Sequence, residues 1–169
     1  MKRKTTQILS ARYLTRGATV AALYVAITFL VSLVGLDKGA IQLRLSEALC
    51  VLPAFMPEAV LGLYIGCIVA NLLTGCLAWD IIFGSLATLI GAIGARALRN
   101  APRRLKWTIP LPTVLANAAI VPLVIKYAYG AEGTYLFFLA TVTAGEIICA
   151  WVLGMIFYYY LEKRYDKLR

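Results

Sequence analysis

The chain has 169 residues, of which 62% are hydrophobic and 15% charged, and its mean hydropathy is +0.81. Soluble proteins average about 25% charged residues, so this composition excludes an ordinary soluble protein and predicts a single all-α integral membrane domain over residues 1–169. The net charge of +9 does not indicate nucleic-acid binding, because the basic residues lie at the ends of apolar runs rather than on a polar face.

Six apolar runs predict a compact bundle of six transmembrane helices. They cover residues 17–36, 45–57, 59–78, 81–98, 109–127 and 134–160. The basic segment before the first run resembles the start of a signal peptide, but the run is too long for one, so a retained helix is expected. The second run is short, because about 13 residues at 1.5 Å each reach only ~20 Å of a ~30 Å hydrocarbon core. A re-entrant segment is the alternative there.

The basic residues predict the direction of the helices, since cytoplasmic loops carry an excess of Lys and Arg. The N-terminal segment holds five of the 17 basic residues, the segment 96–106 holds five and the C-terminal segment holds four. Only Lys38, Arg44 and Lys126 remain for the outer side. If the three basic segments share one side, an even number of crossings separates the first from the second. Four apolar runs lie between them, and four crossings meet this condition whereas three do not. The second run is therefore expected to span, and both termini are expected to be cytoplasmic.

Small residues repeat every four positions on three of the predicted helices. The stripes are Gly62, Gly66 and Ala70; Ala87, Gly91 and Ala95; and Ala18, Ala22 and Ala26. Lipid gives no hydrophobic drive between helices, so small residues that let backbones approach closely mark helix contacts. Packing within the bundle is the expected role of the first two stripes. For the third stripe, spacing leaves internal packing and a partner surface equally open.

A few polar and aromatic side chains interrupt the apolar background, and the predicted direction places all of them in the outer half of the membrane. They are Arg44, Glu47, Asn71, Trp79, Asp80, Asn117 and Glu146. Ionisable groups inside a bilayer are costly and usually face a cavity, so these residues predict an outward-facing binding pocket. Glu146 lies about twelve residues into its run, ~18 Å deep, which is too deep for its side chain to reach the surface.

Each of these residues also has a purely structural alternative. Arg44 could be an interfacial arginine paired with Glu47, one helical turn away. Asp80 could be the N-cap of the fourth helix, and Trp79 an aromatic anchor at the membrane surface. Glu146 could be a buried glutamate kept for packing, and the two asparagines could hydrogen-bond neighbouring helices.

The sequence offers no constellation for catalysis or metal binding. It has four cysteines without CxxC spacing and no histidine, which disfavours a zinc or redox site. It also lacks a phosphate-binding loop of the GxxxxGK type and the GxSxG and HExxH patterns. We therefore expect no enzyme, no resident cofactor and no metal. A pocket of carboxylates and amides instead predicts a binder of a polar ligand, on which Trp79 or Tyr135 could stack.

The order of these motifs resembles the QueT family, the substrate-binding S components of energy-coupling factor (ECF) transporters for queuosine precursors. The resemblance rests on LRLSEALCVLPAFMPEAVLGLYIGCIVANLL and WDIIFGSLATLIGA, with AALYVAI in the first run, PLPTVLANAAIV in the fifth and GEIICAWVLG in the sixth. These elements occur in order and together cover most of the chain. The length, six runs and a cytoplasmic N-terminus agree with the resemblance.

The resemblance implies capture of a 7-deazaguanine with a cyano or aminomethyl group at position 7, or of queuine, at the cell membrane of a prokaryote. A guanine-like edge would then be accepted by Glu47 or Glu146, because a carboxylate takes two adjacent N–H donors. Asp80 or the other glutamate would lie near the 7-substituent, since an aminomethyl cation requires a second acid. The two asparagines would orient the ring, and Arg44 would close the mouth of the pocket.

The resemblance also implies partners: a transmembrane T protein and two ATPases, which supply the energy for import. S components of this family dock on the T protein through an AxxxA face of the first helix, and the stripe of Ala18, Ala22 and Ala26 matches it. Three other functions remain open at this point. They are an S component for another vitamin, a stand-alone secondary transporter, and a small membrane enzyme, which the absence of a metal or nucleophile constellation disfavours.

Overall fold

The computed structural model describes residues 10–35 and 43–166, with side chains up to residue 164, and this part of the chain is all-helical. Its elements are α2 (Ala11–Val34), the 3₁₀ helix η1 (Leu45–Val51), α3 (Leu52–Phe55), α4 (Glu58–Leu73), α5 (Ala78–Ala97), the 3₁₀ helices η2 (Leu98–Asn100) and η3 (Arg103–Thr108), α6 (Leu111–Leu123), the π-helix η4 (Val124–Ala128), α7 (Tyr135–Glu146), the π-helix η5 (Ile147–Leu153) and α8 (Gly154–Asp166).

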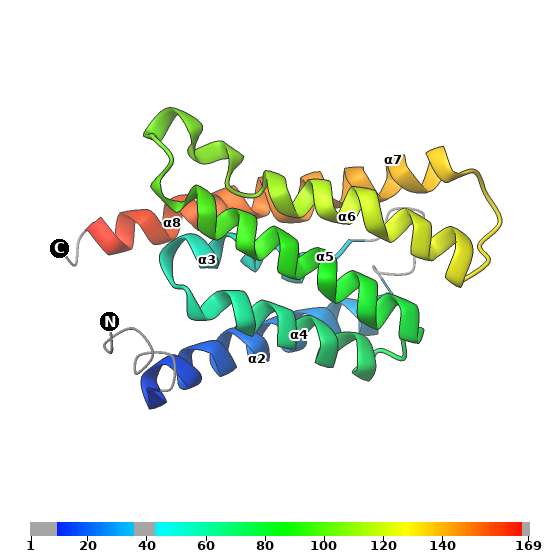
Figure 1. Ribbon diagram of the computed structural model, residues 1–169, viewed down its shortest axis with the longest axis horizontal. Coiled ribbons are helices and arrows are strands. Elements are labelled where there is room, and N and C mark those ends of the chain that lie inside the picture. Colours follow the sequence, from blue (N-terminus) through cyan, green and yellow to red (C-terminus); the bar gives the residue numbers. More distant parts are fainter. Residues whose placement is uncertain (1–9, 36–42, 167–169) are drawn as a thin grey trace, which may run out of the picture.

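The helical segments run back and forth along one axis, so that α2 begins and α8 ends at the same end of the molecule (Figure 1). Within the described residues, four segments are long and apolar enough to cross a membrane, namely Ala11–Val34, Ala78–Asn100, Arg103–Ala128 and Tyr135–Arg164. Two apolar helices are shorter, Leu45–Phe55 and Glu58–Leu73. The predicted all-helical class and order of apolar segments agree with this structure, and six membrane crossings stay a prediction.

Local sequence signals explain where the long helices begin and turn. Ser10 caps α2 by accepting from the Tyr13 N–H at 3.2 Å, and Thr134 caps α7 in the same way. After α4 the chain reverses at Gly75, whose φ of +74° lies in the left-handed region that favours glycine. The turn is short, so the end of α4 and the start of α5 stay close together.

Close backbone approach accounts for two of the three small-residue stripes. A Cβ at Gly62 would lie 2.6 Å from the carbonyl oxygen of Gly17, and one at Gly66 would lie 2.9 Å from Tyr24 Cβ, so α4 packs directly on α2. In the second stripe, Gly91 of α5 meets Thr113 of α6 in the same way. The predicted packing role of both stripes is confirmed. The third stripe differs, because Ala18, Ala22 and Ala26 are all exposed.

The shortest apolar segment lies at the centre of the bundle. Helix η1 packs against α2, α5, η5 and α8, and Leu49 and Val51 join it to two separate parts of the core. A 3₁₀ helix rises about 2.0 Å per residue, so it reaches further than an α-helix of equal length. Non-helical or irregular backbone is tolerated at membrane depth where protein surrounds it. Because protein rather than lipid surrounds η1, this run does not need the length of a regular helix that crosses the bilayer in contact with lipid.

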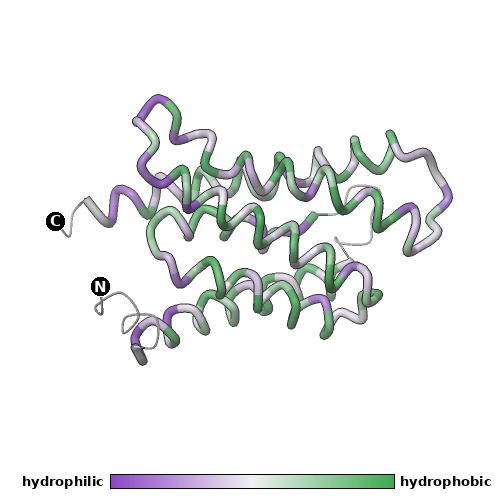
Figure 2. Tube along the Cα trace, viewed as in Figure 1, coloured by the Kyte–Doolittle hydropathy of each residue, from purple (hydrophilic) through white to green (hydrophobic). Residues whose placement is uncertain are grey.

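Hydrophobic residues predominate along the helices, and hydrophilic residues are concentrated toward the two ends of the bundle (Figure 2). Large side chains such as Leu33, Leu72 and Leu136 are more than half exposed, as suits contact with lipid. Helices η2 and η3 lie at the end where α2 begins (Figure 1), and the basic residues of these segments include Arg12, Arg16, Arg99, Arg103 and Arg104. Lys38 and the basic residues at 2–4, 167 and 169 lie outside the described residues.

Candidate substrate-binding site

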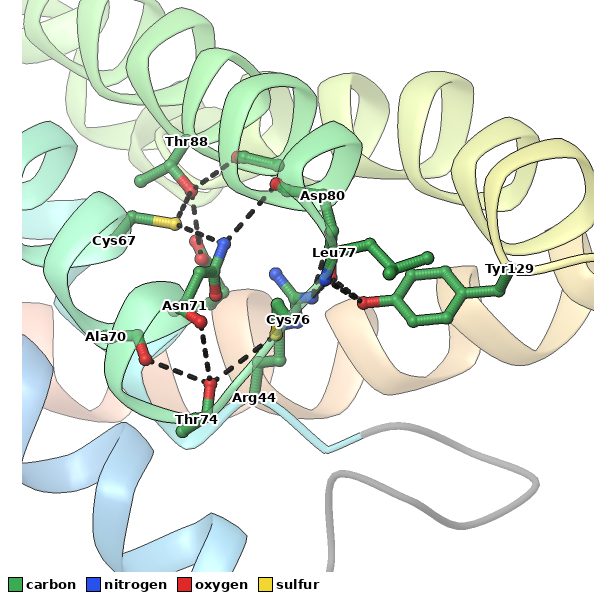
Figure 3. A network of polar contacts seen from close by, with 12 residues as sticks. Arg44, Cys67, Ala70, Asn71, Thr74, Cys76, Leu77, Asp80, Thr88 and Tyr129 are labelled. Atoms are coloured by element: carbon green, nitrogen blue, oxygen red, sulfur yellow. Dashed lines mark hydrogen bonds and ion pairs between the residues drawn. The ribbon is translucent and has the colours of Figure 1, made fainter.

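An ion pair joins the segment before η1 to the first turn of α5 (Figure 3). Arg44 Nη2 lies 3.3 Å from Asp80 Oδ2 and 3.5 Å from Oδ1. Two structural alternatives are therefore wrong: Arg44 pairs with Asp80 rather than with Glu47, and Asp80 is the third residue of α5, whose N-cap is Leu77. The pair is well shielded from solvent, because the exposed fractions of the two side chains are 16% and 7%.

Tyr129 supports this ion pair from the segment that follows η4. Its hydroxyl donates to Asp80 Oδ2 at 3.2 Å and accepts from the Leu77 N–H at 3.2 Å. Partial burial raises the pKa of Tyr129 to about 12, and the neighbouring Asp80 carboxylate acts in the same direction. The hydroxyl therefore keeps its proton at neutral pH and remains a donor.

Asn71, near the end of α4, lies beside Asp80. Its amide nitrogen donates to the carbonyl oxygen of Asp80 at 3.4 Å and contacts Cys67 Sγ at 3.7 Å. Gly84 allows this approach, because a Cβ there would lie 3.0 Å from Asp80 Oδ1 and 3.4 Å from Asn71 Nδ2. The helices α4 and α5 thus bring an amide and a carboxylate to one place.

A cavity of about 330 Å³ opens beside these groups. Arg44, Asn71, Asp80 and Tyr129 line it together with Thr28, Val31, Leu43, Thr74, Gly75, Cys76, Val121, Ile125 and Ala131. Ligand pockets typically occupy about 300–1,000 Å³ and combine apolar walls with a few polar groups, so this cavity has the volume and lining for a small molecule.

Glu47 lies deeper, on η1, and is 1% exposed. The Tyr24 hydroxyl donates to its Oε1 at 2.5 Å, and the Thr88 hydroxyl donates to the same atom at 3.2 Å. These two donors fix the carboxylate from α2 and α5. Its second oxygen, Oε2, is buried and has no hydrogen-bond partner among the described residues.

Glu146, at the end of α7, and Asn117, on α6, lie near Glu47. Asn117 lies beside the Glu146 carboxylate, and its amide nitrogen donates to the Thr113 carbonyl oxygen at 3.2 Å. Glu146 lies within electrostatic range of both Glu47 and Arg44. Glu146 Oε2 and Asn117 Oδ1 are again buried without a partner in the described part of the chain, as is Thr113 Oγ1.

Irregular helices place the two glutamates. Glu47 lies within the 3₁₀ helix η1, whereas Glu146 is the last residue of α7, immediately before the π-helix η5. The two irregular helices η1 and η5 pack against each other. Single-turn π-helices inside α-helices are rare and frequently occur at functional sites, because they redirect side chains.

The structure brings together all of the predicted substrate-binding residues except Trp79. Arg44, Asn71 and Asp80 line the cavity, and Glu47, Asn117 and Glu146 form the buried centre next to it. The Trp79 side chain is 57% exposed and stacks on Phe83, with ring centroids 5.9 Å apart. It therefore faces an apolar groove on the outer surface, away from the cavity.

Sequence reasoning missed the hydroxyl groups of the site, which belong to Tyr24, Thr88 and Tyr129. A tyrosine in the middle of an apolar helix is a usable signal, since a buried hydroxyl requires a partner. Thr88 gave no such signal, because a helical threonine can satisfy its hydroxyl on its own backbone, and it also does so here with the Gly84 carbonyl oxygen. Tyr129 resembles an ordinary interfacial aromatic.

Comparison with known proteins identifies the family of this chain. A family model described as QueT transporter matches residues 14–163. The chain belongs to the QueT transporter family. A curated relative, the queuosine precursor transporter QueT of Lactococcus lactis subsp. cremoris (strain MG1363), is 28% identical over 159 residues, which cover 90% of this chain and 93% of the relative. No solved structure matches the chain.

Membership of the QueT family confirms the predicted resemblance. It also confirms that the protein is a transporter rather than an enzyme. The apolar helices agree with this assignment, because a multi-pass membrane protein needs several segments that can cross a bilayer.

Proposed function

We propose that this QueT-family protein captures a queuosine precursor of the 7-deazaguanine type from the outer side of the membrane. The observation that carries the proposal is a set of three buried acceptor atoms without partners, namely Glu47 Oε2, Asn117 Oδ1 and Glu146 Oε2. Buried polar atoms are nearly always hydrogen-bonded in native proteins, so a cluster of unpartnered ones beside a cavity in a transporter supports the presence of a ligand there. Such a ligand must supply N–H or O–H donors.

A guanine-like ring has the matching donors. Its N1–H and N2–H₂ groups are adjacent and can bind one carboxylate as a pair, and its O6 accepts from an arginine or amide. In the proposed complex, Glu47 or Glu146 takes this edge, and Asn117 and Asn71 orient the ring. Arg44 closes the mouth, since it is the residue that lines the cavity and also lies within electrostatic range of both glutamates.

For energy coupling we propose that the chain is the S component of an ECF transporter. All six helical segments then cross the cell membrane of a prokaryote, with both termini cytoplasmic, as the basic residues at one end of the bundle favour. The absence of a phosphate-binding loop in the sequence supports ATP hydrolysis by partners, two ATPases joined to a transmembrane T protein.

The proposed docking surface for the T protein is the stripe of Ala18, Ala22 and Ala26 on α2. All three side chains are exposed, and Ala22 and Ala26 line an apolar groove together with Val69 and Leu73 of α4. Small side chains on an exposed stripe let a second helix approach closely. Internal packing leaves this surface uncovered, which favours the partner role over the packing role.

Calorimetric titration of the purified protein with 7-aminomethyl-7-deazaguanine tests the ligand proposal. We expect Glu47→Gln and Glu146→Gln each to weaken binding by more than tenfold, which is ~1.4 kcal/mol, because a charge-assisted acceptor is replaced by a neutral one of the same shape. Glu58→Gln is the matched control. Glu58 is also buried, but it pairs with Arg16 on the basic end of the bundle.

The control variant should bind with unchanged affinity. If the unmodified protein does not bind the compound, the proposed ligand class is wrong. If both glutamate variants bind as tightly as the unmodified protein, the ligand class stands and the proposed site is wrong.

A further inference from the structure

An apolar groove lies on the outside of the bundle, between the start of α5 and the end of α6 with η4. Its volume is about 520 Å³, and its lining residues are Trp79, Phe83, Ile120, Leu123, Val124, Tyr127 and Ala128. Ligand pockets typically occupy about 300–1,000 Å³, so the groove is large enough to hold a ligand. It is separate from the cavity beside Arg44, because the two have no lining residue in common.

Large aromatic side chains form much of this groove. Trp79 and Phe83 stack with their ring centroids 5.9 Å apart, and the Tyr127 side chain is 74% exposed. Helices that pack against each other in a membrane meet through small residues that let the backbones approach closely. These bulky walls therefore do not suit a partner helix. A thin and flexible acyl chain, in contrast, can lie along them.

The groove lies where a lipid headgroup would be. The start of α5 and helix η4 are both at the end of the bundle opposite to the start of α2 (Figure 1). Trp79 is the second residue of α5, and Tyr127 is the fourth residue of η4. Tryptophan and tyrosine are enriched at the membrane–water interface, at the level of the headgroups. An acyl chain in the groove would thus end in a headgroup close to these two residues.

A lysine lies next to the groove at this level. The Lys126 ammonium is 5.8 Å from the centroid of the Tyr127 ring, which itself lines the groove. No carboxylate of the described residues pairs with it, since the ion pairs found there involve Arg16, Arg44 and Lys106. An ammonium group binds phosphate as a point charge. An unpaired cation beside an apolar groove therefore matches a phosphate that carries acyl chains.

We propose that this groove binds an anionic phospholipid, with an acyl chain against Trp79 and Phe83 and the phosphate at Lys126. An anionic lipid binds better than a zwitterionic one, because no choline or ethanolamine cation offsets its phosphate charge. This site is additional to the proposed function and does not depend on which compound the protein transports.

Fluorescence quenching in phosphatidylcholine bilayers tests the proposal at this one site. Trp107→Phe and Trp151→Phe leave Trp79 as the only tryptophan of the chain, and lipids with brominated acyl chains quench a tryptophan that they contact. We expect brominated phosphatidylglycerol to half-quench Trp79 at a mole fraction about fivefold lower than brominated phosphatidylcholine, which corresponds to ~1 kcal/mol for one lysine. Lys126→Gln should reduce this difference to less than about twofold, and Lys126→Arg, which keeps the charge, should retain it.

Leu136→Trp in a chain without the three native tryptophans is the matched control. Leu136 is 72% exposed in the first turn of α7 and does not line the groove. Its replacement should be quenched equally by both brominated lipids. Equal quenching of Trp79 by the two lipids, no quenching of Trp79, or an undiminished difference in the Lys126→Gln variant would overturn the proposal. The same preference at position 136 would also overturn it, because general enrichment of the anionic lipid around the protein would then explain the result.

Discussion

At the level of single residues, Gly84 has a role that its lack of a side chain conceals. It lies one turn after Asp80 on α5, and a Cβ there would meet both the Asp80 carboxylate and the Asn71 amide. These atoms are the ends of side chains, so they can shift without unfolding the helix. The shift would move Asp80 relative to Arg44 and reduce the space beside the cavity.

We therefore expect Gly84→Ala to weaken ligand binding by about tenfold, ~1.4 kcal/mol, with little loss of thermal stability. Titration and a melting curve of the same preparation measure the two effects. Gly17→Ala is the matched control, since it adds a methyl group to α2 where the nearest atom, the Glu58 carbonyl oxygen, is 3.4 Å away. Unchanged affinity in the Gly84 variant would contradict this role.

The hydroxyl of Tyr24 provides a second test, because it holds Glu47 in place. Removing it as Tyr24→Phe leaves Glu47 Oε1 with Thr88 alone. Hydrogen bonds to charged groups contribute about 1.5–3 kcal/mol, so we expect a clearly lower Tm in detergent. Tyr64→Phe on α4 should leave Tm unchanged, since the Tyr64 hydroxyl has no hydrogen bond within the described chain. Equal Tm values for both variants would show that Tyr24 does not stabilise the site.

The sequence predicted most of the polar residues of the site and misplaced one. Ionisable and amide groups in apolar helices are costly, and that cost is sufficient reason to expect them to converge. Trp79 and Asp80 are neighbours on α5, however, and adjacent helical residues point about 100° apart. Because Asp80 faces Arg44, Trp79 has to face outward. Sequence alone does not say which of two neighbours faces the cavity.

At the level of helices, the hydrophobic runs predicted the apolar segments in order. They did not predict that η1 is a 3₁₀ helix or that η4 and η5 are π-helices. Whether a backbone carbonyl accepts from the third, fourth or fifth residue ahead depends on packing, which a hydropathy pattern does not contain. The relative placement of Glu47 and Glu146 depends on η1 and η5 and was therefore beyond sequence reasoning.

The exposed stripe on α2 leads to a prediction about coupling. We expect Ala22→Leu to abolish ATP-dependent uptake and co-purification with the T protein, because a larger side chain prevents close approach of a partner helix. Ligand affinity should stay within about threefold, ~0.65 kcal/mol. Ala140→Leu is a matched control on α7, where an exposed alanine lies outside the stripe. Its uptake should be normal.

Two outcomes of this experiment would count against the proposal. Full uptake by the Ala22 variant would remove the docking role from the stripe. Uptake that persists in cells without the ATPases would indicate a stand-alone secondary transporter instead of an S component.

At the level of the whole molecule, the orientation in the membrane can be measured with introduced cysteines. In a variant whose four native cysteines are replaced, we expect Arg104→Cys and Lys163→Cys to react with an impermeant thiol reagent only from the cytoplasmic side. Glu132→Cys, in the loop at the opposite end, should react only from outside. All three positions are exposed. Labelling of residue 104 from outside would mean that the segment Leu45–Phe55 does not cross the membrane.

The central position of η1 also fixes the order in which the protein is completed during synthesis. This segment leaves the ribosome early, but two of the elements that enclose it, η5 and α8, come last among the described elements. Until they arrive, a short helix with a buried glutamate lacks part of its surroundings, and lipid cannot replace hydrogen-bonding neighbours. Glu47 and Glu146 meet only at that stage. The binding centre therefore cannot be complete before α7 and η5 are made, and a chain shortened before these elements loses it.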